Sequence, residues 1–256
     1  MMEKKVEIVF SPTGGTRSAV QEVSSGWDLP KESIDLCVEE ANNKDFIFSG
    51  RELCIIGVPS YGGRVPDIAR QRILNLNGNH ASAILIVSYG NRAYDDTLLE
   101  LKEIAEKANF IVVAAISAVT EHSIMHQFGT GRPNASDRRI LKEFAEKIKE
   151  KTEKESNSGE ISVPGKVPYR NYDGIALKPK ASKKCTNCGI CASHCPVGAI
   201  DKENCRLTNV QLCISCMSCI EICPQKARSL NKLIKMAAGK KLKNVCSNPK
   251  ENELFI

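Results

Sequence analysis

The sequence predicts an α/β protein in two parts: a doubly wound parallel sheet of five strands, followed by a small α+β module. The sheet is predicted because apolar, β-branched runs alternate with segments of helical periodicity through residues 1–153. The second module is predicted because ten of the twelve cysteines lie beyond residue 184. A chain of 256 residues has room for one sizeable core and a smaller second domain.

The expected strands and helices alternate along the N-terminal part. Strands are predicted at 6–10, 34–38, 53–58, 83–87 and 111–116, of which the second has the weakest pattern. Helices are predicted at 15–25, 67–76, 95–108 and 137–151. The last two helices carry clear apolar stripes, which we interpret as core. Helices between parallel strands cover both faces of a sheet.

The first strand is followed by the loop SPTGGTR, at the sheet edge where doubly wound folds bind their ligands. Ser11, Thr13 and Thr16 offer hydroxyl groups, while Gly14 and Gly15 let backbone N–H groups approach an anion at the start of a helix. The loop lacks the Lys-Ser/Thr pair of a Walker A motif and the G-x-G-x-x-G of the dinucleotide fingerprint. It therefore predicts a phosphate site of another kind.

Two further loops follow later strands, and each combines an aromatic ring with glycine and polar groups. The candidate ligand-binding residues in them are Ser60, Tyr61, Gly62, Gly63, Ser88, Tyr89, Gly90, Asn91 and Tyr94. The last predicted strand is followed by a long irregular stretch, 119–136, which we expect to cover the ligand or to face the second module.

The first loop resembles the phosphate loop of flavodoxins, roughly T/S-x-T-G-x-T, at Ser11, Thr13, Gly14 and Thr16. The resemblance implies a flavodoxin-like sheet of strand order 2-1-3-4-5 that binds flavin mononucleotide (FMN). It also implies that the two later loops hold the isoalloxazine ring, with Tyr61 and either Tyr89 or Tyr94 stacked on it. The alternative is that one or more of these rings only closes the end of the sheet.

The cysteines form two identical C-x2-C-x2-C-x3-C-P runs, and each cysteine of the second run lies 28 residues after its counterpart. The runs are Cys185, Cys188, Cys191 and Cys195 before Pro196, and Cys213, Cys216, Cys219 and Cys223 before Pro224. Zinc sites are usually built from two separated pairs of ligands, so zinc is the weaker alternative. The spacing is that of bacterial ferredoxins with two 4Fe-4S clusters, in which the fourth cysteine of each run ligates the other cluster.

This crossed assignment predicts two ligand sets. One cluster is expected on Cys185, Cys188, Cys191 and Cys223, and the other on Cys213, Cys216, Cys219 and Cys195. The other four cysteines, Cys37, Cys54, Cys205 and Cys246, are expected to be buried or spare thiols.

The chain divides into a flavodoxin-like domain at 1–153, a linker at 154–182, a ferredoxin module at 183–232 and a basic tail at 233–256. Residues 154–256 hold 17 Lys and Arg against 8 Asp and Glu, a formal charge of +9 within the net +6 of the chain. Eight thiolates on two oxidised clusters change the charge by about −4, and an FMN phosphate by up to about −2. The near-neutral sum disfavours nucleic acid as a partner.

As a whole, the sequence resembles the flavodoxin–ferredoxin fusion family. The resemblance implies electron transfer between FMN and two clusters, and partners that are redox proteins of unspecified identity. Two alternatives remain: an FMN-dependent reductase with Arg64, Arg92 or His122 facing a small substrate, and a redox or iron sensor that uses the basic tail. His122 and His126 as a metal pair is a weaker reading of the long loop. We expect a cytoplasmic protein, since the sequence shows neither an apolar run of membrane-spanning length nor a signal-peptide pattern.

Overall fold

The computed structural model describes residues 2–38, 48–154 and 161–256. Its strands are β1 (Lys4–Val9), β2 (Lys31–Asp35), β3 (Glu52–Pro59), β4 (Ser82–Tyr89), β5 (Ile111–Val119), β6 (Lys180–Ala181), β7 (Arg228–Ser229) and β8 (Glu253–Phe255). Its helices are α1 (Gly15–Ser24), α2 (Asp67–Leu74), α3 (Thr97–Lys107), α4 (Ala135–Lys154), α5 (Ile190–Ser193), α6 (Ser218–Glu221) and α7 (Lys232–Cys246). In this part of the chain no helix has the length and apolar character needed to cross a membrane.

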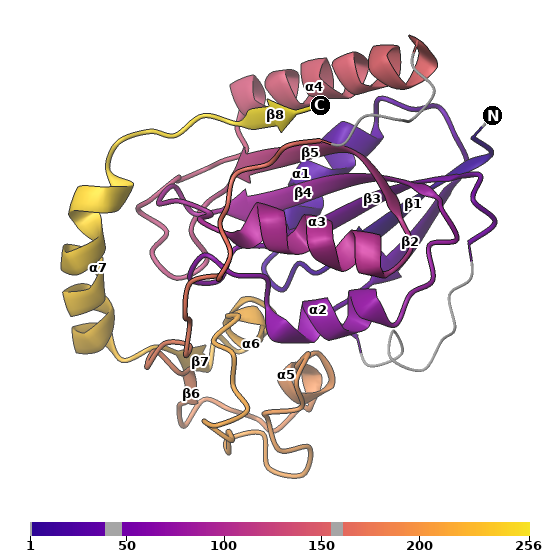
Figure 1. Cartoon of the computed structure of the whole chain (residues 1–256). Coiled ribbons are helices and arrows are strands. Elements are labelled where there is room, and N and C mark those ends of the chain that lie inside the picture. The colour runs from indigo at the N-terminus through magenta and orange to yellow at the C-terminus, as the bar shows by residue number, and fades with distance from the viewer. Residues whose placement is uncertain (1, 39–47, 155–160) are drawn as a thin grey trace.

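The main sheet has the order β2-β1-β3-β4-β5-β8 (Figure 1). Strands β1 to β5 are parallel, so the predicted order 2-1-3-4-5 is confirmed. Strand β8 adds a sixth, antiparallel strand, pairing Ser117 with Glu253 and Ala115 with Phe255. Because side chains alternate along a strand, Leu254 packs into the core on one face of the sheet and Phe255 into the core on the other.

Helices cover both faces of the sheet. Figure 1 shows α4 above the sheet and α2 and α3 in front of it, and α1 packs with α4. On the α1 and α4 face, Val20 and Leu141 are fully buried; on the α2 and α3 face, Ile73 and Leu98 are. The interior strand β4 is buried along its whole length, as central strands of a doubly covered parallel sheet are.

Helix α4 begins at Ala135, two residues before the predicted start, because Asn134 caps it. The side-chain oxygen of Asn134 accepts hydrogen bonds from the N–H groups of Ser136 at 2.9 Å and Asp137 at 3.1 Å. Such a cap satisfies N–H groups that have no partner within the helix. The predicted start was placed by the apolar stripe, which begins further along the chain. An N-cap depends on a single side chain and leaves no periodic pattern.

The described part of the predicted linker, residues 161–182, first lies along the flavodoxin-like domain and then joins the cysteine-rich module, where β6 pairs with β7. Asp96 accepts hydrogen bonds from the backbone N–H groups of Lys166 at 3.1 Å and Arg170 at 2.8 Å. The ring of Tyr172 packs directly on Gly62. Residues 155–160 of the predicted linker lie outside the described residues.

The predicted basic tail returns to the main sheet. All of its lysines except Lys250 lie on α7, which packs through Ala238 and Leu242 near Met217 of the cysteine-rich module. The chain then runs back to form β8 (Figure 1). The C-terminal residues therefore connect the two modules and belong to the fold of both.

Candidate cofactor sites

The phosphate loop presents an open helix start. Gly14, with φ +86°, is the N-cap of α1, and a Cβ added there meets nothing within 4 Å. The hydroxyl of Ser11 accepts a hydrogen bond from the N–H of Arg17 at 3.0 Å, and the buried hydroxyls of Thr16 and Ser88 lie 2.7 Å apart. No acidic residue lies in the first turn of α1, so its positive end is available to an anion.

The loop borders a cleft of about 400 Å³ whose walls come from both modules. The flavodoxin-like domain contributes Ser11, Pro12, Thr13, Gly14, Arg17, Asp35, Cys37 and Val38. The cysteine-rich module contributes His194, Ser218, Glu221 and Ile222. Gly15 lies on the other side of the loop, where a Cβ would come within 3.3 Å of Thr120. The cysteine-rich module therefore forms part of the wall of the predicted phosphate site.

The loop after β3 is shaped by two glycines. Gly62 and Gly63 have φ of +61° and +87°, and a Cβ on Gly62 would lie 2.0 Å from the ring of Tyr172. Tyr61 pairs through its backbone with Arg64, and the hydroxyl of Ser60 lies 2.8 Å from that of Thr97. Burial, followed by the charges of Cys216 and Cys37, raises the pKa of Tyr61 well above its ordinary value.

The loop after β4 holds the C-terminal segment. The rings of Tyr89 and Tyr94 pack edge to face with centroids 5.2 Å apart. The Tyr94 hydroxyl donates to Glu253 Oε2 at 2.7 Å, and the Tyr89 hydroxyl donates to the carbonyl of Glu251 at 3.3 Å. Both rings are buried, which gives them an anchoring role. Their predicted role as stacking partners of a flavin stays a prediction.

The neighbouring Gly90 and Asn91 are also engaged by the protein itself. A Cβ on Gly90 would lie 2.6 Å from His122. The buried Asn91 amide donates to the carbonyls of Cys246 at 2.5 Å and Asn248 at 3.0 Å, and its oxygen accepts from the N–H of Lys250 at 3.0 Å. Sequence analysis did not predict this anchoring, because its partners lie about 155 residues further along the chain.

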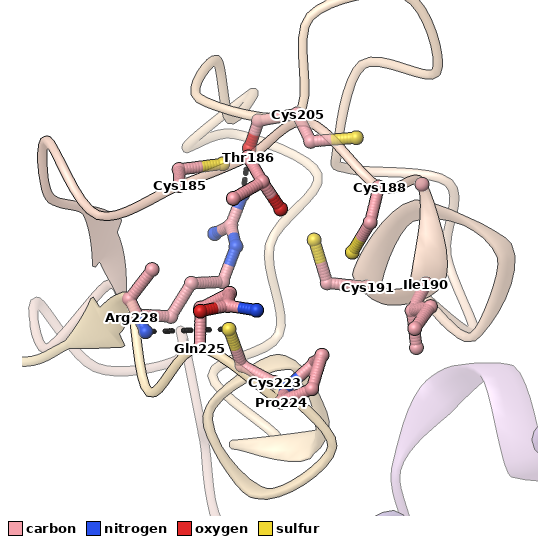
Figure 2. A pocket seen from close by; sticks show the side chains of 12 residues that line it. Cys185, Thr186, Cys188, Ile190, Cys191, Cys205, Cys223, Pro224, Gln225 and Arg228 are labelled. Atoms are coloured by element: carbon pink, nitrogen blue, oxygen red, sulfur yellow. Dashed lines mark hydrogen bonds between the residues drawn. The ribbon is translucent and has the colours of Figure 1, made fainter.

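Three cysteines of each run line one cavity, and the fourth cysteine of that run lines the other cavity. The first cavity is lined by Cys185, Cys188, Cys191 and Cys223 (Figure 2), and the second by Cys195, Cys213, Cys216 and Cys219. The structure therefore brings together the thiols of each predicted set. Among the described residues, no three His, Cys, Asp or Glu side chains are arranged to share one metal ion. Four thiols spread around a cavity suit a cluster of several irons better than a single zinc ion.

The four remaining cysteines are mostly buried, as predicted. Cys54, Cys205 and Cys246 are buried, and Cys37 is partly buried beside the phosphate cleft. Cys205 also lines the first cavity, where it is a fifth cysteine (Figure 2).

Backbone N–H groups point at the cysteine that crosses to the other cavity. The N–H of Ala199 donates to Cys195 Sγ at 3.2 Å, and that of Ala227 donates to Cys223 Sγ at 3.3 Å. Burial alone would raise the pKa of the Cys223 thiol. Hydrogen bonds from backbone N–H groups, including that of Ala227, have the larger combined effect and hold the pKa below its ordinary value. Such hydrogen bonds stabilise a thiolate and tune a bound cluster.

The second run is more deeply buried. Burial raises the pKa of Cys216 to about 12 and that of Cys219 to about 11. Thiols in such surroundings ionise when a metal replaces the proton, so metal binding at the second cavity releases protons.

Sequence analysis missed one residue that joins the two modules. Arg72 of α2 has a fully buried side chain; its guanidinium donates to the carbonyl of Leu36 at 2.6 Å and to that of Pro196 at 2.9 Å. Pro196 directly follows Cys195, so this arginine fixes one cysteine loop against the flavodoxin-like domain. A single arginine within a helix carries no sequence signal for such a contact.

Residues 179–245 match the protein family described as a 4Fe-4S dicluster domain. The chain fits a flavodoxin–ferredoxin fusion. The flavodoxin part of this assignment rests on the strand order of the sheet, and the ferredoxin part on the family match.

The chain is similar to several solved structures, and no curated protein matches it. The two-electron reduced flavodoxin of Megasphaera elsdenii is 16% identical, with a TM-score of 0.37 over 56% of this chain and 98% of that one. The flavodoxin of Fusobacterium nucleatum bound to FMN is 16% identical, with a TM-score of 0.37 over 57% and 98%. An FMN-dependent NADH-azoreductase from Bacillus anthracis is 13% identical, with a TM-score of 0.35 over 57% and 99%.

Proposed function

We propose that the fusion protein relays electrons between FMN, held at the phosphate loop, and two 4Fe-4S clusters, held by the two crossed cysteine sets. FMN exchanges electrons singly or in pairs, whereas each cluster exchanges one at a time. A chain that holds both couples two-electron partners to one-electron partners. The residues of this chain hold the three centres, exclude water from them and set their potentials.

The observation that carries this proposal is a shared wall. Ser218 lines both the phosphate-loop cleft and the second cysteine cavity. The lining of the first cavity comes from the cysteine-rich module alone. The second cluster therefore stands between FMN and the first cluster in the relay, and the first cluster is reached from outside at the exposed Cys188.

The three side chains considered for a reductase make internal contacts instead. Arg64 forms an ion pair with Glu100 at 2.7 Å and lies over the ring of Tyr169, 4.9 Å from its centroid. Arg92 pairs with Asp95. The Nδ1 of His122 accepts from two backbone N–H groups. These contacts favour a carrier over an enzyme that binds a small substrate with these groups.

Anaerobic purification with iron, sulfide and flavin analysis tests the cofactors. We expect about eight irons and one FMN per chain. Absence of FMN after mild purification contradicts the flavin part of the proposal, and a zinc content with little iron contradicts the cluster part.

Matched cysteine variants test the order of the relay. Cys216→Ser and Cys188→Ser each remove one ligand from one set, and each should lower the iron content by about four. Reduced ferredoxin, a one-electron donor, should then reduce the FMN of both variants at least ~10-fold more slowly than that of the wild type, in stopped-flow absorbance. If reduction of FMN is equally fast without the second cluster, electrons do not pass through it.

A further inference from the structure

The two halves of the cysteine-rich module differ at one buried position. The 28-residue repeat aligns Ile200, five residues after Cys195, with Arg228, five residues after Cys223. Both positions are equally buried, at 4% and 3% exposure. The backbone bonds to Cys195 and Cys223 described above are also the same in the two halves. The fold accommodates an apolar side chain in one half, so packing alone does not require an arginine in the other.

Arg228 lies between the two cysteine cavities. It lines both of them, and Figure 2 shows its side chain extending among the cysteines of the first. One terminal nitrogen, Nη1, lies 3.9 Å from Cys219 Sγ, a predicted ligand of the second cluster. Arg228 and Cys191, a predicted ligand of the first cluster, both line the first cavity. Arg228 thus lies beside predicted ligands of both sets.

No carboxylate in the described part of the chain balances this charge. Nη2 donates to the carbonyl of Cys205 at 2.6 Å, and Nη1 donates to the hydroxyl of Thr208 at 3.1 Å. Within residues 2–38, 48–154 and 161–256, its Nε has no hydrogen-bond partner and no Asp or Glu forms an ion pair with it. Burial of a guanidinium without a charge partner is unfavourable. Its burial calls for a negative group in the cavities.

Two thiolate-bound clusters supply that negative charge. A 4Fe-4S core of charge 2+ with four thiolates carries about −2, and reduction makes it about −3. A fixed cation attracts the reduced state more strongly than the oxidised state, and this attraction is little screened in a buried site.

We infer that Arg228 is the shared counter-ion of the two clusters and raises the reduction potentials of both. This inference rests on the proposed binding of two clusters. Arg228 is a positioning and tuning residue, since it acts through the clusters and takes no electron itself. The equivalent position in the first half is Ile200, which carries no charge. One cation therefore serves both clusters.

Redox titration of the anaerobically purified holoprotein, followed by electron paramagnetic resonance, tests this role. Arg228→Ile places the residue of the first half into the second and should shift both cluster potentials to lower values. Arg228→Lys keeps the charge and should leave both cluster potentials close to those of the wild type. Arg206→Ile is the matched control. Like Arg228, Arg206 donates to a cysteine carbonyl, that of Cys185 at 3.0 Å, but it is exposed to solvent. Its loss should move the potentials much less.

Iron analysis separates failure of the inference from failure of the proposed function. A wild type without about eight irons overturns the proposed function before any variant is compared. Fully loaded Arg228→Ile with unchanged potentials overturns the inference, as does an equal shift in Arg228→Lys. If Arg228→Ile does not assemble clusters, Arg228→Gln, which keeps hydrogen-bond donors, replaces it in the titration. If neither neutral variant assembles clusters, Arg228 is needed for assembly and its proposed role in tuning is wrong.

Discussion

His122 is held neutral by its surroundings. Its Nδ1 accepts hydrogen bonds from the N–H groups of Ile124 at 3.2 Å and Met125 at 3.4 Å, which only the neutral ring can do at that atom. Burial, with the charge of His126 adding to it, lowers the pKa of His122 to about 4. His126 turns instead to Glu121, 2.7 Å away. The two histidines therefore shape the loop after β5, and the metal pair considered from their spacing finds no support here.

The depressed pKa of His122 predicts a loss of stability in mild acid. The unfolded chain binds a proton at this histidine near pH 6.5, whereas the folded chain does so only near pH 4. The unfolded state therefore gains protons first, and the free energy of unfolding falls as the pH falls through this window, by up to about 1.4 kcal/mol per pH unit. Urea unfolding at pH 7.5, 6.5 and 5.5 measures the slope. His122→Gln should reduce the slope, and an unchanged slope contradicts the assignment.

At the scale of elements, strand β8 depends on a single buried amide just before it. The side-chain oxygen of Asn252 accepts from the N–H of Val119 at 2.8 Å, and its nitrogen donates to Asp137 Oδ1 at 3.0 Å. The residue thus links the end of β5 to the start of α4. Replacing it leaves a buried N–H and a carboxylate oxygen each short of a partner.

Asn252→Ala should therefore lower the free energy of unfolding by about 1–3 kcal/mol. Glu251→Ala is the control, because the Glu251 side chain is exposed and only its backbone carbonyl contacts the sheet. Denaturant unfolding monitored by circular dichroism compares the two variants. Equal stability of both variants would show that β8 is held by its three backbone pairs alone.

The elements of the sheet could be predicted from the sequence because each of them repeats a local pattern. The structure contains all five predicted parallel strands and all four predicted helices. Most of these elements carry a pattern of apolar residues over six or more positions. Strand β8 has only three residues, Glu253–Phe255, which is too short for a period to be seen. No edge strand is therefore predicted there from the sequence.

At the scale of the whole molecule, the sequence predicts the two modules but not how they meet. The cysteine spacing predicts the ligand sets because one tight loop sets the distances among three of each four thiols. The contact between modules depends on side chains far apart in the chain, such as Arg72 with Pro196 and Tyr172 with Gly62. No local pattern distinguishes these residues, so only the folded structure shows the cleft that the modules share.

The last prediction concerns this contact between modules. Arg72→Met keeps the length of the side chain and removes the donors that bind the carbonyls of Leu36 and Pro196. Each lost hydrogen bond to a charged group costs about 1.5–3 kcal/mol, so the cysteine-rich module should open from the sheet at least ~10-fold more often. Hydrogen exchange of residues 179–229 measures this opening.

Electron flow should respond in the same direction while the cofactors stay bound, because neither the cysteines nor the phosphate loop is changed. In Arg72→Met we expect unchanged iron and FMN contents, and slower reduction of FMN by reduced ferredoxin. Arg70→Met on the same helix is the control, since Arg70 is only half-buried and pairs with Asp67 of its own helix at 2.6 Å. If Arg72→Met exchanges hydrogen no faster than Arg70→Met, the module is fixed to the sheet by other contacts, and the linker with its Asp96 bonds becomes the element to test.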